Sequence, residues 1–93
     1  MVTAIVLVCA RRDKIDETAQ GLIKLDGVAE VYSVAGEYDL VAIIRAPNNE
    51  AMAEVVTGHM LRMDGIERTE TLVAFRAYSE HDLERMFGIG LED

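Results

Sequence analysis

A short turn in the middle of the chain holds the residues whose types and spacing are best suited to bind a ligand. Gly36, Glu37, Tyr38 and Asp39 are consecutive, and an apolar run begins immediately after them. Charged side chains are rarely placed at such points without a partner. The Asp39 carboxylate therefore either binds backbone amides of the turn or faces a pocket at the sheet edge. Tyr38 is open to two similar interpretations, as core packing or as a pocket wall.

Two hydroxyl groups further along the chain form a second candidate for binding. Thr69 and Thr71 are separated by one residue, so a strand presents both side chains on the same face. Threonine is a good strand former, and this preference alone accounts for both residues. The alternative is that the two hydroxyl groups line a polar pocket.

The sequence contains no arrangement typical of catalysis or of metal binding. It has no phosphate-binding loop, no paired cysteines and no nucleophile elbow. His59 lies among apolar residues of a predicted helix, and His81 lies between two acidic residues. We therefore interpret His59 as a partly buried histidine at the edge of the core and His81 as a surface histidine, rather than as metal ligands. We therefore expect no catalytic residue, no metal and no cofactor, and the two histidines have no assigned role.

An internal repeat indicates how the candidate residues are positioned. Leu25-Asp26-Gly27-Val28 recurs as Met63-Asp64-Gly65-Ile66, a shift of 38 residues. Each copy lies between a segment of helical periodicity and a segment of strand periodicity, and each helical segment follows an apolar run. The chain therefore predicts the order strand–helix–strand twice.

The four predicted strands differ in a way that also predicts their order in the sheet. Residues 2–9 and 38–44 are apolar on both alternating faces, which is typical of central strands, whereas residues 28–35 and 66–78 resemble edge strands. A βαββαβ chain with right-handed crossovers has the spatial order 4-1-3-2. The predicted fold is thus α+β, a ferredoxin-like sandwich with a four-stranded antiparallel sheet and two helices on one face.

Local signals predict the boundaries of these elements. Asp13 is expected to cap the first helix, and Gly27 to end it in a left-handed conformation. Gly36 and Glu37 are expected to form a two-residue hairpin turn. Asn48 is expected to take part in capping the second helix.

Two helices can cover only one face of this sheet, yet both central strands are apolar on both faces. The remaining residues, 79–93, are too few to cover all of the second face. We therefore expect a homodimer that stacks sheet on sheet, a dimeric α/β-barrel-like assembly. The alternative is a monomer in which Thr, Ala and Ser make the second face sufficiently polar.

The chain divides into one domain and a tail. Residues 1–78 form the ferredoxin-like domain, and residues 79–93 are expected to form a C-terminal helical tail. Ser79-Glu80-His81-Asp82 resembles a capping box, and three apolar residues follow at helical spacing. The tail is expected to pack on its own domain or on a neighbouring subunit, with a frayed terminus as the alternative.

Composition limits the partners of the chain. Its 93 residues have a net charge of −8 and no block of Lys or Arg. Because nucleic-acid binding depends on neutralising phosphates, direct binding to DNA or to an anionic membrane is not expected. No signal peptide and no run long enough to cross a bilayer is evident. The single cysteine, Cys9, is interpreted as a small hydrophobe in a cytoplasmic protein.

Two strings in this framework resemble a known family. The turn Gly36-Glu37-Tyr38-Asp39-Leu40 precedes an apolar strand, and Gly65-Ile66-Glu67-Arg68-Thr69-Glu70-Thr71-Leu72-Val73 opens the last strand. Over residues 2–78, their order and spacing resemble the effector-binding domain of the Lrp/AsnC (feast/famine) transcription regulators. Those regulators carry a helix-turn-helix before this domain, whereas here the first strand follows Met1 at once. The resemblance is therefore to a stand-alone version of the sensor domain.

The resemblance implies an oligomeric domain that senses a small molecule, commonly an amino acid, at interfaces between dimers. It implies dimers that assemble into rings, often octamers. Such a domain would act either through its own assembly or through association with full-length regulators of the family. The Asp39 carboxylate would accept a hydrogen bond from the ammonium group of the ligand, while turn amides or threonine hydroxyls would donate to the carboxylate of the ligand. Glu37 adds a negative charge that either favours cationic ligands or weakens carboxylate binding. The implied ligand-binding residues are Gly36, Glu37, Tyr38, Asp39, Thr69 and Thr71.

Two other functions are compatible with the fold. Ferredoxin-like dimers include small monooxygenases, whose pockets usually have aromatic walls with a His or Asn inside. This chain has no Trp, only 5% aromatic residues and no His on a predicted strand, so we do not expect an enzyme. The remaining alternative is a structural or heteromeric partner that binds no ligand.

Overall fold

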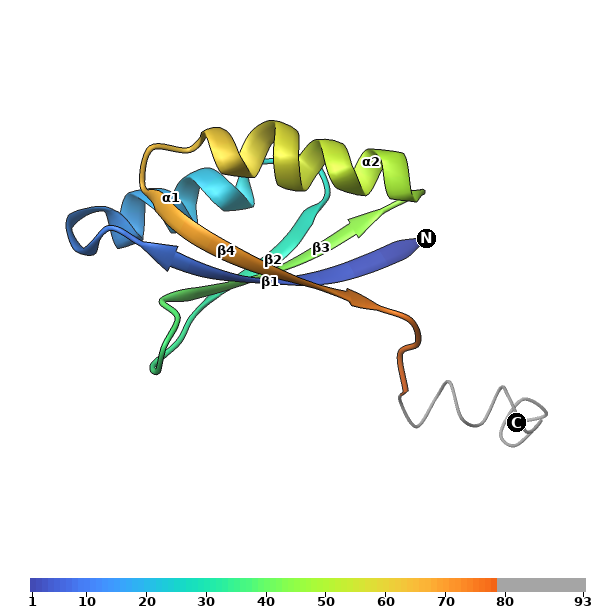
Figure 1. The fold of residues 1–93 in the computed structure, drawn as a ribbon, viewed down its shortest axis with the longest axis horizontal. Helices are drawn as coiled ribbons and strands as arrows, with labels where there is room; N and C mark the ends of the chain where they lie inside the picture. The colour runs from blue at the N-terminus through green and yellow to red at the C-terminus, as the bar shows by residue number, and fades with distance from the viewer. Residues whose placement is uncertain (79–93) are drawn as a thin grey trace.

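A computed structural model describes residues 1–78, which form one sheet with two helical segments packed on it (Figure 1). The predicted tail at 79–93 lies outside the described residues. Short helical turns adjoin the two helices: a 3-10 turn at Arg12–Lys14, a π-helical stretch at Glu54–His59 and a 3-10 turn at Met60–Arg62. The main elements are β1 (Val2–Ala10), α1 (Ile15–Ile23), β2 (Val28–Ser33), β3 (Leu40–Ala46), α2 (Asn49–Ala53) and β4 (Ile66–Ala74).

The sheet has the predicted topology. Its strands are ordered β2-β3-β1-β4, and every neighbouring pair is antiparallel. The apolar strands β1 and β3 are therefore central, and β2 and β4 form the edges. This confirms the βαββαβ sandwich in the order 4-1-3-2, read from the opposite edge.

The core lies between the sheet and the helical layer. Both helical segments lie on the same face of the sheet (Figure 1), as predicted. Alternate residues of the central strands are buried beneath them, and side chains of the helical segments complete the cluster. Its fully buried members include Val6, Val8, Leu22, Leu40, Ile44 and Met60.

The repeat seen in the sequence corresponds to two equivalent turns. In the first copy the Val28 amide donates to the Leu25 carbonyl at 3.2 Å, and in the second the Ile66 amide donates to the Met63 carbonyl at the same distance. Gly27 has a φ of 95°, a conformation that favours glycine. Its left-handed backbone thus belongs to the turn that leads into β2, a few residues beyond the end of α1.

The predicted end of the first helix at Gly27 is wrong, because α1 ends at Ile23, and three further predicted boundaries are also wrong. Asp13 does not cap a helix: the chain enters α1 through a 3-10 turn, and the Asp13 carboxylate pairs with Arg11 at 3.5 Å. The hairpin is longer than two residues, because β2 ends at Ser33 and β3 begins at Leu40. The strand predicted to reach residue 78 ends at Ala74. The expected cap at Asn48 is confirmed, since its side chain accepts from the Ala51 amide at 2.8 Å.

The second face of the sheet is apolar at its centre, and no element within residues 1–78 covers it. In the register of the strands, Ile5 lies between Ile43 and Leu72, and Leu7 lies beside Val41. Leu72 is 47% exposed. We call these five residues the open apolar face. Among the described residues, no helix is long and apolar enough to cross a membrane.

Candidate ligand-binding site

The turn between β2 and β3 is an exposed loop closed by one backbone hydrogen bond. The Val34 amide donates to the Asp39 carbonyl at 3.0 Å, so the residues between them form the loop. Gly36 has a φ of 132°, which a residue with a side chain rarely adopts, and nothing lies within 4 Å of where its Cβ would be. Gly36 and Glu37 are therefore accessible at the tip of the turn.

Asp39 fastens this turn to the neighbouring strand. Its backbone amide donates to the Val8 carbonyl at 2.9 Å, and its carboxylate accepts from the Ala10 amide at 2.9 Å. The carboxylate thus satisfies the last amide of β1, and the side chain is half-buried. The Asp39 carboxylate thus binds a backbone amide, which belongs to β1 rather than to the turn, and its contact with a ligand stays a prediction.

The Tyr38 side chain lies next to a cation contributed by β4. The Arg68 Cζ atom is 5.5 Å from the centroid of the Tyr38 ring, within range of a cation–π contact. Cys9, which pairs with Arg68 across β1 and β4, has its thiol 3.5 Å from the Glu37 carbonyl. A side-chain hydrogen bond with Cys9 and, after it, the nearby Tyr38 raise the pKa of Arg68 above its ordinary value.

The two threonines lie on the other face of the sheet. Thr69 pairs with Val8 and Thr71 pairs with Val6, and both valines are buried under the helices. Directly paired residues point to the same side of a sheet, so both hydroxyl groups are on the helical side of the edge strand. Arg68 points to the opposite side. The structure therefore brings Glu37, Tyr38 and Asp39 together and separates them from Thr69 and Thr71.

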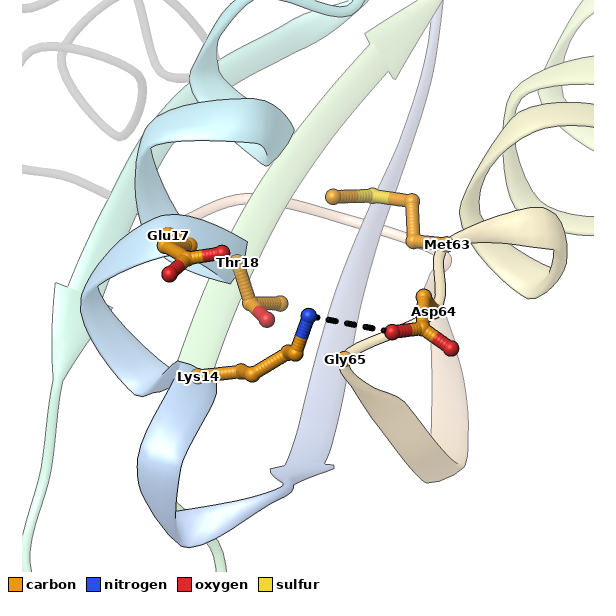
Figure 2. Close-up of a pocket in the computed structure, with 6 residues that line it drawn as sticks. All are labelled: Lys14, Glu17, Thr18, Met63, Asp64 and Gly65. Atoms are coloured by element: carbon orange, nitrogen blue, oxygen red, sulfur yellow. Dashed lines mark ion pairs between the residues drawn. The ribbon is translucent and has the colours of Figure 1, made fainter.

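A pocket of about 280 Å3 lies on the helical side of the sheet (Figure 2). It is formed where the start of α1 approaches the loop before β4. The Lys14 Nζ atom lies 3.2 Å from the Asp64 carboxylate, and the same oxygen is 3.7 Å from Arg11. Figure 2 shows the Lys14 ammonium directed toward Asp64, with the Thr18 side chain beside the loop that carries Gly65. The lining residues are Lys14, Glu17, Thr18, Met63, Asp64 and Gly65.

The sequence interpretation missed this pocket and the cation beside Tyr38. Lys14 precedes α1 directly and Thr18 lies in its first turn, so their nearness in the sequence was the available signal. Asp64 and Gly65 were recognised only as part of the repeated turn. Arg68 precedes Thr69 on the strand and so points to the opposite face, but its contact with Tyr38 depends on how the turn folds across β1.

Metal-ligating groups do not gather within residues 1–78. No three His, Cys, Asp or Glu side chains there are arranged to hold a metal ion. His59 is half exposed and lies 3.8 Å from the Glu54 carboxylate, and His81 lies outside the described part of the chain.

Comparison with protein families gives a match over almost the whole chain. The model of the Lrp/AsnC ligand binding domain matches residues 3–83. Among solved structures, TTHA0845 from Thermus thermophilus is 48% identical, with a TM-score of 0.81. The match covers 86% of this chain and 100% of that one.

Two further relatives are longer proteins. PH1692 of Pyrococcus horikoshii, named as an uncharacterized HTH-type transcriptional regulator, is 38% identical over 78 residues. Those residues are 84% of this chain and 52% of the relative. The feast or famine regulatory protein Rv3291c of M. tuberculosis, whose structure is a complex with L-methionine, shares the fold. Its TM-score is 0.71 at 22% identity, covering 86% of this chain and 54% of that one. The chain spans about half the length of the curated relatives that it matches.

Proposed function

The chain belongs to the Lrp/AsnC ligand-binding domain family, and we propose that it acts as an oligomeric domain that senses a free amino acid. The observation that carries this proposal is the family match over residues 3–83, together with the shared fold of relatives. L-Methionine bound to the more distant Rv3291c supports the chemical class of the ligand. Relatives named as transcriptional regulators support a regulatory, non-enzymatic role.

The proposed effector site uses the turn residues Gly36, Glu37, Tyr38 and Asp39 and the hydroxyl groups of Thr69 and Thr71. Because Tyr38 and the threonines belong to opposite faces of one sheet, a single ligand would contact both groups only where two subunits meet. This supports a site at an interface between subunits. Ligand affinity would then depend on the oligomeric state, and oligomeric state on ligand.

The open apolar face supports a homodimer that stacks sheet on sheet. Ile5, Leu7, Val41 and Ile43 on the central strands, with Leu72 on the edge, present a continuous apolar area. Contiguous exposed apolar surface commonly marks an interface. We propose further that such dimers assemble into a ring, with an octamer as the expected size.

The proposed route from ligand to gene regulation is indirect. A net charge of −8 without a basic block opposes contact with DNA phosphates. The signal would therefore pass through association with full-length regulators of the family, in the cytoplasm. A change in the assembly of this domain on binding ligand is the simplest form of that signal.

Light scattering after size exclusion, with and without each of the common amino acids, tests this function. We expect at least one amino acid to change the mass of the assembly, because binding at a shared interface favours one oligomeric state. Calorimetry with the same amino acids measures affinity independently of assembly. Absence of binding by the whole panel would contradict the proposed ligand class and favour a structural or heteromeric partner.

Two substitutions separate the proposed ligand role of Asp39 from its structural role. Asp39→Asn keeps an oxygen that can accept from the Ala10 amide but removes the charge, whereas Asp39→Ala removes both. We expect both variants to weaken binding of the amino acid identified above by about tenfold, the size of one charge-assisted contact. Equal affinities for the wild type and Asp39→Asn would remove Asp39 from the site.

A further inference from the structure

The pocket between α1 and the loop before β4 contains a nearly buried hydroxyl group without a partner in the described structure. Thr18 is only 3% exposed, yet its hydroxyl makes no side-chain hydrogen bond among residues 1–78. Every fully enclosed side-chain polar atom of the described residues has a partner, so the Thr18 oxygen keeps a small opening. That oxygen faces the same space as the Lys14 ammonium (Figure 2). Buried hydroxyls normally find a partner, so this one is available to a ligand in the pocket.

The pocket presents charges of both signs at short range. The Lys14 ammonium carries three donors, and the Asp64 carboxylate lies 3.2 Å from it across the pocket. Asp64 is largely exposed, with 76% of its side chain accessible, so the pair can open at little cost. Met63 adds an apolar wall, and Glu17 adds a second carboxylate to the lining.

We propose that this pocket binds the charged head group of a free amino acid. The ligand carboxylate would accept from Lys14 and from the Thr18 hydroxyl, while its ammonium group would donate to Asp64. The volume of about 280 Å3 is slightly below the roughly 300 Å3 at which the range of ligand pockets begins, which suits a group as small as an amino-acid head group. The inference rests on the proposed amino-acid ligand but assigns a site distinct from the turn.

The pocket lies on the helical side of the sheet. The open apolar face is on the other side, so a dimer that stacks through that face would leave the pocket accessible. A single subunit would then bind ligand here, in contrast to the turn.

An NMR titration of the full chain with L-methionine, and then with the other common amino acids, locates any bound ligand. We expect amide shifts to change at residues 14–18 and 63–66. The same titration with L-methioninamide, which lacks the carboxylate, is expected to give binding at least about tenfold weaker, because the charge-assisted contact with Lys14 is lost.

Variants test the assigned contacts. We expect Thr18→Val to weaken binding about fivefold and Lys14→Met about tenfold or more. Thr57→Val is the matched control, because its hydroxyl already donates to the Ala53 carbonyl at 2.6 Å outside the pocket. The NMR shifts serve as a second readout if Thr18→Val fails to fold.

The outcomes separate this inference from the proposed function. An amino acid that binds with shifts confined to residues 36–39, or with unchanged affinity in both Thr18→Val and Lys14→Met, overturns the pocket assignment alone. No binding by any amino acid overturns the proposed ligand class, and the pocket assignment with it. Ligand-induced NMR shifts at the pocket that are lost in Lys14→Met but kept in Thr57→Val support the pocket assignment.

Discussion

Asp39 illustrates how a residue with apparent binding chemistry can also hold the fold. Its carboxylate accepts from the Ala10 amide at 2.9 Å, in a half-buried position at the end of β1. Because a hydrogen bond to a charged group is worth more than a neutral one, this contact contributes to stability whether or not a ligand is present.

We therefore expect Asp39→Ala to reduce the free energy of unfolding by about 2 kcal/mol. Asp39→Asn should lose less, since the amide oxygen can still accept from Ala10. Chemical denaturation of both variants measures the difference. Equal stability of Asp39→Ala and the wild type would show that water replaces the carboxylate without cost.

Tyr32 gives a pH-dependent prediction. Its hydroxyl donates to the Glu30 carboxylate at 2.7 Å, and this hydrogen bond, followed by the repulsion from the same charge, raises the pKa of Tyr32. The folded state therefore holds the phenol proton more tightly than the unfolded state does. The resulting stability is present below the unfolded pKa of about 10 and is lost as the pH rises through the folded pKa.

Near-ultraviolet absorbance across an alkaline titration measures this effect. We expect Glu30→Gln to lower the midpoint of one tyrosine compared with the wild type. Superimposable curves for the two proteins would contradict the contact.

At the residue scale, the sequence located the turn correctly but could not identify the partners of its side chains. Tyr38 contacts Arg68 of β4, and Asp39 accepts a hydrogen bond from Ala10 of β1. Residue type and spacing indicate that a side chain needs a partner, while the partner depends on strand register. The buried hydroxyl of Thr18 was missed for the same reason.

The repeated turns show how glycine acts at the scale of elements. Gly27 is needed for its backbone conformation, whereas Gly65 is needed for space. A Cβ on Gly65 would collide with the Thr18 hydroxyl and lie 3.2 Å from the Lys14 Cβ. The two copies of the repeat thus keep glycine for different physical reasons.

We expect Gly65→Ala to destabilise the domain by about 3 kcal/mol, since overpacking forces α1 away from the loop. Gly36→Ala is the control: its Cβ would meet open space, so only backbone strain of about 1 kcal/mol applies. Thermal or chemical unfolding distinguishes the two. A smaller loss for Gly65→Ala than for Gly36→Ala would contradict the close packing.

The sequence predicted which helices and strands the domain contains, but it predicted the residues at which they begin and end less well. The periodicity of the apolar residues identified all four strands and both helical segments. The end of β2 and the start of β3 depend on Asp39, whose amide donates to the Val8 carbonyl in β1. The entry into α1 depends on the Arg11 amide, which donates to the carbonyl of Gly65 in the loop before β4. Such long-range bonds leave no local pattern.

At the scale of the whole molecule, the open apolar face is the main feature without an intramolecular role in the described residues. Ile43 lies at its centre, paired with Ile5 on the next strand. The composition of the two central strands predicted this two-sided apolar sheet, although sequence alone could not identify what covers it.

We expect Ile43→Glu to abolish the proposed dimer, because a charge at the centre of an apolar interface has no partner there. Gln20→Glu, on the exposed surface of α1, adds the same charge elsewhere and should leave the assembly intact. Light scattering measures the mass of each variant. A dimer that survives Ile43→Glu would rule out stacking through this face.

Each half of the domain donates a backbone hydrogen bond to the glycine turn of the other half. The Gly27 carbonyl in the first half accepts from Arg45 in the second, and the Gly65 carbonyl in the second accepts from Arg11 in the first, both at 2.8 Å. Each strand–helix–strand half also contributes one of the two paired central strands. Neither half therefore has a complete sheet or a satisfied turn alone, and the domain must fold and unfold as a single cooperative unit. A destabilising substitution in one half would therefore lower the free energy of unfolding of the other half by the same amount.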